Sequence, residues 1–451
     1  MNSPENMIQR IAKSLVPSKS GQNKLAKISN EIKNEILSFK DSRILKVTLG
    51  GSFPKGTWLD NDTDIDFFVM IEQTVDRKEF EELGKKVGFH ALKKYKPYLR
   101  YSEHPYVEGR VDGIRVNIVP CYKVEKNNWK SAADRSPYHT DFMQKMLNEF
   151  LKSEVRVLKL FLKSIGTYGS QISISGFSGY VTEVLILKHG SFRNVLQAFA
   201  ELKANSVVSL DTPDEKTLSK FKSPIIIIDP IDMNRNLGAA ISPECVSKFV
   251  LASRNFLKDP SFEFFKVSKP NANTIKQIKS NLLVVEFKIQ RRSPDILWGQ
   301  LKRKLSSISK QLESARFEII NTFCFTDEQE RAIFIFTAEL TKLSKLTVND
   351  GPEIFLGKET DAFINKRKSK SIMMITEGVR IISIEETKKR SIKEHARLII
   401  EKDIKSGAKT GITLDLSKGY SIYLASERVL NSFVSTAISR MVCDGEFIRH
   451  R

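Results

Sequence analysis

Residues 50–66 read Gly-Gly-Ser-Phe-Pro-Lys-Gly-Thr-Trp-Leu-Asp-Asn-Asp-Thr-Asp-Ile-Asp, and this stretch decides the fold of the first part of the chain. The apolar run Phe67-Phe68-Val69-Met70 follows it and predicts a buried strand. Side chains two residues apart on a strand point to the same face. We therefore expect Asp64 and Asp66 to project together, while Ile65 faces a hydrophobic core.

The pair of carboxylates predicts a cation site. Neighbouring carboxylates repel each other unless a cation lies between them. Mg²⁺ prefers oxygen ligands and is often shared with nucleotide phosphates, so it is the expected occupant. The turn at Gly51 and Ser52 offers backbone N–H groups and a hydroxyl to a phosphate. The stretch therefore predicts a nucleotide-and-metal site, whereas an isolated Asp-x-Asp pair would indicate an exposed turn.

The same stretch carries a superfamily resemblance. G-S-x-x-x-G-T followed by D-x-D resembles the signature of the nucleotidyltransferase superfamily to which DNA polymerase β belongs. The resemblance implies two metal ions held by three carboxylates, the third on a strand that pairs near the first. Residues 104–122 fit that place, because Asp112-Gly113 is a strong type I′ hairpin signal between alternating strands. The second strand should present Arg115, Asn117 and Val119 on one face.

Longer motifs narrow the resemblance to one family. The segments G-S-F-P-K-G-T-W-L, D-I-D-F-F, V-P-C-Y-K and K-S-A-A-D-R-S-P-Y-H resemble those of the archaeal, class I CCA-adding enzymes, also called tRNA nucleotidyltransferases. The similarity continues to L-W-G-Q-L-K at 297–302 and covers nearly the whole chain. It implies addition of C, C and A to the 3′ end of tRNA from CTP and ATP, with Mg²⁺ and without a nucleic-acid template.

Residue 117 departs from the family pattern. The resemblance places an aspartate, the third metal ligand, two residues before V-P-C-Y, and this chain has Asn117 there. An amide oxygen can touch a metal, but it brings no negative charge and takes no proton from the RNA 3′-hydroxyl. Asp112 lies in the turn and cannot replace it without rebuilding the hairpin. The asparagine is either natural in an impaired enzyme or introduced to trap a complex, and the sequence leaves both open.

The resemblance also assigns residues to the nucleotide. Residues implied to bind its triphosphate or line its site are Gly51, Ser52, Lys55, Thr57, Lys159 and Tyr168. Arg235 matches an arginine that reads the incoming base together with the RNA, and His139 is a candidate contact to ribose or phosphate. Plain structural roles stay open for three of these residues: a solvated basic helix face for Lys159, a surface position for Arg235, and a capping or core position for His139.

Composition sets further bounds. The chain has 451 residues, 41% of them hydrophobic, which suffices for about three domains with large cores. A net charge of +20 predicts a polyanionic partner such as a folded RNA, unless it only makes a soluble basic surface. The absence of a long apolar run predicts a cytoplasmic protein without a membrane span. The four cysteines, at 121, 245, 324 and 443, lack metal spacing and are expected to be reduced and buried.

Hydrophobic periodicity and the resemblance together divide the chain into three predicted domains. Residues 1–148 are expected to form a polymerase β-like nucleotidyltransferase head. Residues 149–262 should form a helical central domain that recognises the nucleotide and base, with a short strand at 225–228 before a loop that carries Arg235. Residues 263–451 should form a C-terminal α+β tRNA-binding body and tail, with helices on an antiparallel sheet. The predicted fold class is therefore α+β and multidomain.

Two other functions stay open at the level of sequence. Another terminal RNA nucleotidyltransferase, such as a poly(A)-adding enzyme, would share the metal motif but add a homopolymer. A catalytically silent tRNA-binding homologue would keep the fold and lose turnover, as Asn117 allows. The oligomeric state also stays open, with a homodimer as one alternative.

Overall fold

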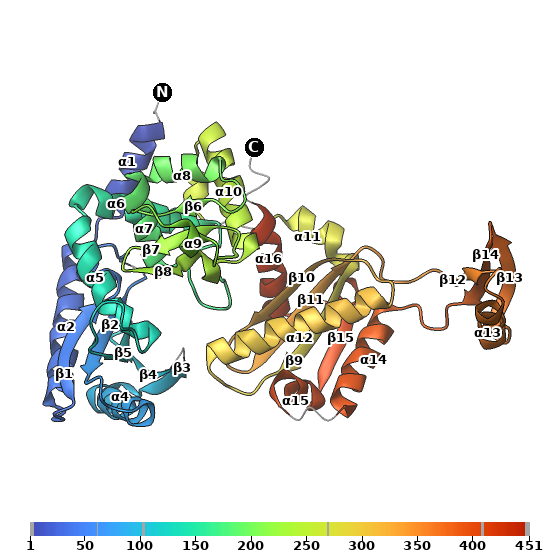
Figure 1. Cartoon of the computed structure of the whole chain (residues 1–451), viewed down its shortest axis with the longest axis horizontal. Helices are drawn as coiled ribbons and strands as arrows, with labels where there is room; N and C mark the ends of the chain where they lie inside the picture. The colour runs from blue at the N-terminus through green and yellow to red at the C-terminus, as the bar shows by residue number, and fades with distance from the viewer. Residues whose placement is uncertain (1–3, 61, 102–103, 268–269, 407–409, 447–451) are drawn as a thin grey trace. The chain divides into compact units, whose positions relative to one another are not determined.

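The computed structural model describes residues 4–60, 62–101, 104–267, 270–406 and 410–446 (Figure 1). The chain divides into two compact units, one of Met1–Lys269 with Asp444–Arg451 and the other of Pro270–Cys443. Both units mix helices with sheets, which confirms the predicted α+β class. No helix among the described residues is long and apolar enough to cross a membrane.

The first unit contains a five-stranded sheet of order β1-β2-β5-β4-β3. Its strands are β1 (Ile44–Gly50), β2 (Asp64–Ile71), β3 (Tyr98–Tyr101), β4 (Pro105–Val111) and β5 (Ile114–Tyr122). β5 runs parallel to β2, and the other neighbours are antiparallel. At the β4–β5 turn, Asp112 and Gly113 have φ of +49° and +83°, as the predicted type I′ turn requires.

Helices pack on this sheet because successive side chains of its strands point to opposite faces. In β2 one face is apolar and the other carries Asp64 and Asp66. Ile65, Phe67 and Val69 are buried against helices α2 (Lys19–Ser38) and α4 (Arg77–Ala91). The N-terminus of α2 is capped by Ser18 and that of α4 by Asp76. Helices α3 (Ser52–Lys55) and α5 (Arg135–Met146) also lie at the sheet, whereas α1 (Pro4–Ser14) packs on the helical part that follows.

The central part of the first unit is mainly helical, as predicted. Its helices are α6 (Glu149–Ser164), α7 (Gly179–His189), α8 (Phe192–Ala200), α9 (Glu215–Leu218) and α10 (Pro243–Lys258). A cluster of phenylalanines fills the core between them, with Phe161 at its centre. A small sheet of β6 (Val207–Val208), β7 (Ile226–Asp229) and β8 (Asp232–Asn236) lies beside these helices. Arg235 lies on β8 and not in a loop, so that prediction was wrong.

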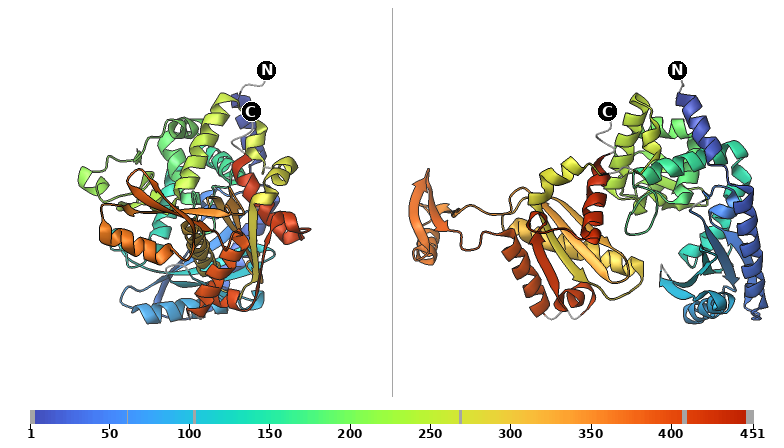
Figure 2. Two further views of the ribbon diagram at one scale, coloured as in Figure 1. Left: turned by 90° about the vertical axis from the view of Figure 1, so that its right-hand side faces the viewer. Right: turned by 180° about the vertical axis from the view of Figure 1, so that it is seen from behind.

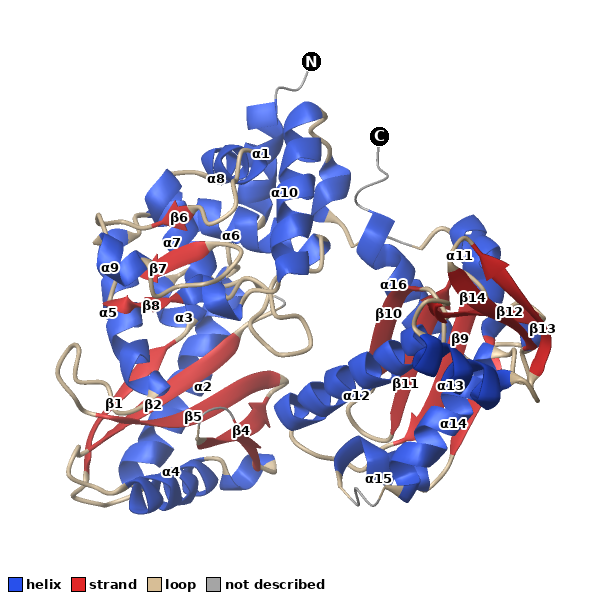
Figure 3. Cartoon of the chain, turned by 45° about the vertical axis from the view of Figure 1, so that its right-hand side comes forward, coloured by secondary structure: helices blue, strands red, loops and turns tan. Residues whose placement is uncertain are grey.

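The second unit is built on a four-stranded antiparallel sheet of order β10-β11-β9-β15 (Figure 2). Its strands are β9 (Leu282–Lys288), β10 (Ile319–Thr326), β11 (Arg331–Ala338) and β15 (Tyr420–Leu424). One face packs on α12 (Pro294–Ser314), α14 (Ile392–Lys405) and α15 (Gly411–Ser417). The other face is covered by α16 (Ser432–Glu446), with α11 (Ala272–Ile278) contributing at the edge (Figure 3). The predicted arrangement of helices on an antiparallel sheet is present.

A second, three-stranded sheet of order β12-β14-β13 was not predicted from the sequence. It consists of β12 (Leu346–Glu353), β13 (Ser371–Glu377) and β14 (Arg380–Glu386), with helix α13 (Gly357–Arg367) between β12 and β13. Short 3₁₀ turns complete the chain: η1 (Lys93–Tyr95), η2 (Ala132–Asp134), η3 (Leu237–Ala240), η4 (Phe262–Phe265), η5 (Lys279–Asn281) and η6 (Ala425–Glu427). Three cysteines are buried as expected, whereas Cys443 is only half-buried.

Candidate active site

The strand register brings the candidate metal ligands together. β2 and β5 are parallel, and their pairing places Asp64 beside Arg115 and Asp66 beside Asn117. On its other side Asp66 pairs with Gly50, the last residue of β1. The Gly51–Ser52 turn therefore begins next to the Asp66 carboxylate.

Both carboxylates of β2 receive hydrogen bonds from β5. Arg115 donates from Nε and Nη2 to the two oxygens of Asp64, at 2.8 and 2.7 Å. Asn117 donates from Nδ2 to Oδ1 of Asp66 at 2.8 Å. The amide oxygen of Asn117 is buried and has no hydrogen-bond partner among the described residues. A buried, unsatisfied carbonyl oxygen next to two carboxylates is a feature that a bound cation would resolve.

The surroundings of Asp66 disfavour the charged form of its carboxyl group. Burial raises the pKa of its carboxyl group, the bond from Asn117 opposes this rise, and the nearby charge of Asp64 adds to it. Gly51 lies against it with a φ of +74°, and a Cβ at that position would be 2.2 Å from Oδ2 of Asp66. Only glycine fits this close approach.

The donor set fits Mg²⁺. Asp64, Asp66 and the Asn117 carbonyl supply oxygen atoms only, the ligands that this ion prefers. Among the described residues, no group of three or more histidine, cysteine, aspartate and glutamate side chains gathers as a metal site. That finding reflects the amide at position 117, which leaves two carboxylates where the resemblance implied three.

Lys55 and Thr57 meet a buried acid that the sequence analysis missed. Lys55 Nζ lies 2.5 Å from Oε2 of Glu183, and Thr57 donates from Oγ1 to Oε1 of Glu183 at 2.6 Å. Glu183 is on α7 and is fully buried. A single glutamate inside the apolar run V-T-E-V-L-I-L was the available signal, because an isolated charge on a buried helix needs a partner.

Lys159 lies in the same group. It is buried on α6 and donates from Nζ to the carbonyl oxygen of Thr57 at 2.8 Å. Burial lowers the pKa of Lys159 to about 8, although the charge of Glu183 acts in the opposite direction. Tyr168 lies close by, since a Cβ on Gly179 would be 3.1 Å from its hydroxyl and 3.7 Å from Lys159 Nζ. The alternative of a solvated basic helix face therefore fails for Lys159.

His139 and Arg235 belong to a second cluster around Asp229. His139 Nε2 lies 2.9 Å from Asp229 Oδ2, and Arg235 donates from Nη1 to the same oxygen at 3.2 Å. Tyr180 stacks on the His139 ring at 3.9 Å and donates to Asp229 Oδ1 at 3.0 Å. Burial lowers the pKa of His139, although Asp229 opposes this effect. The arrangement favours a core position for His139, while 38% of the Arg235 side chain stays exposed.

The remaining sequence-predicted site residues, Gly51 and Ser52, lie at the start of α3, close to Lys55 in the chain. Gly51 and Ser52 form the turn at the end of β1, and α3 carries Lys55 from there towards Glu183.

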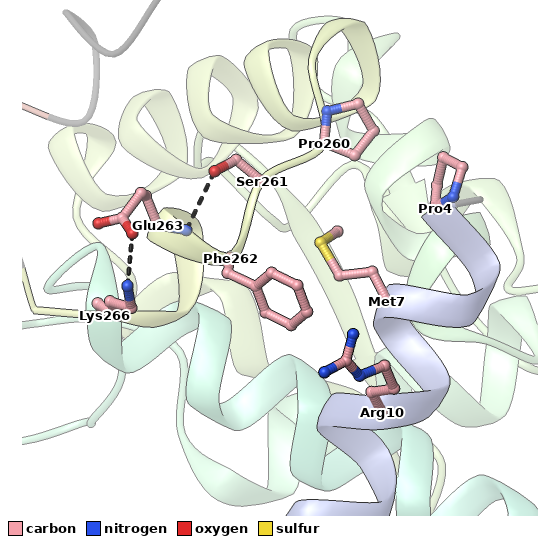
Figure 4. A pocket seen from close by; sticks show the side chains of 8 residues that line it. All are labelled: Pro4, Met7, Arg10, Pro260, Ser261, Phe262, Glu263 and Lys266. Atoms are coloured by element: carbon pink, nitrogen blue, oxygen red, sulfur yellow. Dashed lines mark hydrogen bonds and ion pairs between the residues drawn. The ribbon is translucent and has the colours of Figure 1, made fainter. Parts of the chain in front are cut away.

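A separate pocket of the first unit lies between α1 and η4 and has Arg10 above the Phe262 ring at 5.6 Å (Figure 4). None of the candidate site residues lines that pocket.

Three family models match successive parts of the chain. They describe a nucleotidyltransferase domain over residues 30–139, a tRNA nucleotidyltransferase second domain over 153–266 and a CCA-adding enzyme C-terminal domain over 279–425. The matches follow the order of the fold, from the five-stranded sheet through the helical part to the second unit.

Whole-chain relatives agree with these models. A CCA-adding enzyme of Methanocaldococcus jannaschii is 36% identical, with 80% of this chain and 84% of that protein covered. The CCA-adding enzyme of Saccharolobus shibatae is 34% identical, with 85% of this chain and 89% of that protein covered. The CCA-adding enzyme of Pyrobaculum neutrophilum is 35% identical, with 81% of this chain and 86% of that protein covered. The chain has the paired acids and the turn at Gly51, and it is similar to these enzymes over most of its length. This chain therefore belongs to the family of CCA-adding enzymes, the tRNA nucleotidyltransferases.

Proposed function

We propose that this chain adds C, C and A to tRNA from CTP and ATP at the site formed by β2, β5 and the Gly51 turn, and that Asn117 slows the reaction. The observation that carries the proposal is the register that pairs Asp66 with Asn117 and Asp64 with Arg115. In this register Asn117, the departure from the family pattern, is hydrogen-bonded to Asp66, one of the two acids that we propose to bind the metal.

Asp64, Asp66 and the carbonyl of Asn117 would hold Mg²⁺. When bound, the ion supplies positive charge that offsets the triphosphate and favours loss of the proton from the RNA 3′-hydroxyl. Each Asp64 oxygen accepts one bond from Arg115 and keeps a further lone pair, so the ion would share this carboxylate with the guanidinium or compete with it. Asn117 Nδ2 donates to Asp66 while its Oδ1 accepts no bond among the described residues, so Oδ1 is the atom that the amide would offer to the ion.

The triphosphate would lie against the turn and the buried lysines. Gly51 and Ser52 would offer backbone N–H groups, and Lys55, Lys159 and Tyr168 would contact the phosphates. The burial of Lys159 supports this role, since a buried ammonium with only neutral hydrogen-bond acceptors has a strong preference for an anion. Thr57 would act by holding Lys159 in place.

Base selection would fall to Arg235, whose guanidinium fork is partly exposed while one end is fixed by Asp229. His139 would contribute through Asp229, as a positioning residue and not as a direct ligand of ribose. The net charge of +20 supports tRNA as the polyanion that this chain binds. The proposal includes a cytoplasmic location and a homodimer, and sedimentation analysis tests the second.

Primer extension on tRNA that ends before C-C-A tests the proposal. The assay uses Mg²⁺ with all four nucleotides, and the products are sequenced. Slow addition of C-C-A alone is the expected result. A homopolymer would identify a poly(A)-type enzyme, and tight tRNA binding without any incorporation would identify a silent homologue.

A further inference from the structure

Glu183 is a fully buried acid whose two partners come from a distant part of the chain. Its oxygens contact Lys55 at 2.5 Å and Thr57 at 2.6 Å, and these residues precede it by 128 and 126 positions. Both partners lie in the stretch between the Gly51 turn and the β2 acids. The contact therefore joins helix α7 to the loop that leads into the metal site.

The charges in this group do not balance. Two buried ammonium groups, on Lys55 and Lys159, face one buried carboxylate, on Glu183. Lys55 is paired with that carboxylate directly. Lys159 donates to the carbonyl and hydroxyl of Thr57, which carry no charge. Burying an ammonium is costly without a compensating anion, so the group has one positive charge in excess and attracts a further anion.

We propose that Glu183 is a positioning residue of the nucleotide site, which fixes Lys55 and Thr57 and, through Thr57, holds Lys159 in place for the triphosphate. The inference rests on the proposed role of Lys55 and Lys159 in binding that triphosphate. Glu183 itself contacts no phosphate in this scheme. It acts through the lysines, and the triphosphate takes over part of its role when it binds.

The electrostatic surroundings of Lys159 give the inference a measurable signature. The groups whose charges act on it are Glu183, Lys55, Asp62 and Lys163, and the Tyr168 hydroxyl lies nearby. Burial lowers its pKa to about 8, Glu183 and Asp62 raise it, and Lys55 and Lys163 lower it further. Removal of the Glu183 charge should therefore lower the pKa of Lys159, and removal of the Lys55 charge should raise it.

The test measures CTP affinity by calorimetry between about pH 5 and pH 9 for the full chain. In the parent, affinity should fall above about pH 8 as Lys159 loses its proton. In Glu183→Gln, the midpoint of this fall should move down by about 1 to 3 pH units, the usual effect of one nearby opposite charge. Glu154→Gln is the matched control, because Glu154 is also buried but accepts a bond from the backbone of Phe192. It should keep the parent midpoint.

A second pair of variants covers the case in which Glu183→Gln does not fold. Lys55→Met should move the midpoint up, and the double variant Lys55→Met with Glu183→Met should return it close to the parent value, because both buried charges leave together. If the pH midpoint of CTP affinity stays at the parent value in every one of these variants, the inference is overturned. If Lys159→Met binds CTP as tightly as the parent, the proposed triphosphate role fails instead, which separates the two outcomes.

Discussion

Replacing Asn117 by aspartate should convert a slow enzyme into a fast one. The change places a carboxylate on β5 directly beside Asp66, where the amide nitrogen now lies 2.8 Å from Oδ1. The new group can bind Mg²⁺ with charge and can assist deprotonation of the 3′-hydroxyl. General-base help of this kind is worth about 10² to 10⁴ in rate, or about 2.7 to 5.4 kcal/mol of transition-state stabilisation.

The same substitution should carry a stability cost that Mg²⁺ removes. Without metal, Asn117→Asp loses a hydrogen bond to a charged acceptor, worth about 1.5–3 kcal/mol, and sets two carboxyl groups side by side. The pKa of Asp66 is already raised by burial, and the second carboxyl group raises it further. A raised carboxyl pKa in the folded state means that stability falls as pH rises above about 4, the ordinary aspartate value. Added Mg²⁺ should restore stability by mass action.

Single-turnover incorporation of CTP and ATP at saturating tRNA measures the rate, and thermal unfolding with and without Mg²⁺ measures the stability. Asn117→Ala is the control, because it frees Asp66 from the amide without adding a charge. It should gain no rate. If Asn117→Asp is no faster than the parent, Asn117 does not occupy the third-ligand position, and the functional meaning given to the β2–β5 register is wrong.

Three further predictions concern the same site and its partner. Asp64→Ala and Asp66→Ala should each abolish nucleotide addition and leave tRNA affinity nearly unchanged, because both acids are needed to place the cation; turnover within about tenfold of the parent, or ~1.4 kcal/mol, would contradict the assignment. Gly51→Ala should impair folding or nucleotide binding, since its Cβ would lie 2.2 Å from Asp66 Oδ2 and the residue has a φ of +74°; Gly113→Ala, also at positive φ but with nothing within 4 Å of its Cβ, is the control for backbone strain alone. The affinity for tRNA should fall linearly with salt on a log–log plot, because the net charge of +20 implies several released counterions; a salt-independent dissociation constant would argue against phosphate contacts.

The sequence allowed prediction of the parts of the fold that depend on local pattern. Alternation around Ile65 predicted β2, and Asp112-Gly113 predicted the hairpin that carries β5. The sheet of β12, β13 and β14 went unpredicted. In β12 and β13 most of the apolar side chains are exposed, so the apolar pattern of these strands does not mark a buried face. Arg235 was predicted to lie in a loop because the Asp229-Pro230 pair indicates the end of a strand. In the structure the chain turns at once and continues as strand β8.

The site was less predictable than the fold, since burial and partner choice are tertiary properties. The sequence marked the basic residues Lys55, Lys159 and Arg235, but not Glu183, which pairs with Lys55, or Asp229, which pairs with Arg235. Glu183 and Asp229 lie in apolar segments and are fully buried, and most of their partners come from distant parts of the chain: Lys55 and Thr57 for Glu183, and His139 and Tyr180 for Asp229. Arg115 was placed on the correct face, yet its two bonds to Asp64 depend on the parallel register of β2 and β5.

The two acids of β2 are consequently not equivalent. Asp64 is about one-third exposed and has a guanidinium as its counter-ion, so its charge is already compensated in the absence of metal. Among the described residues, the hydrogen bond to the Asp66 carboxylate comes from the neutral Asn117 amide, and burial raises the pKa of Asp66. A bound cation would supply the positive charge that Asp66 lacks, whereas at Asp64 it would compete with the charge of Arg115. We therefore expect Arg115 to affect how readily the site accepts Mg²⁺, and Asn117 to affect how far the bound ion can assist the reaction.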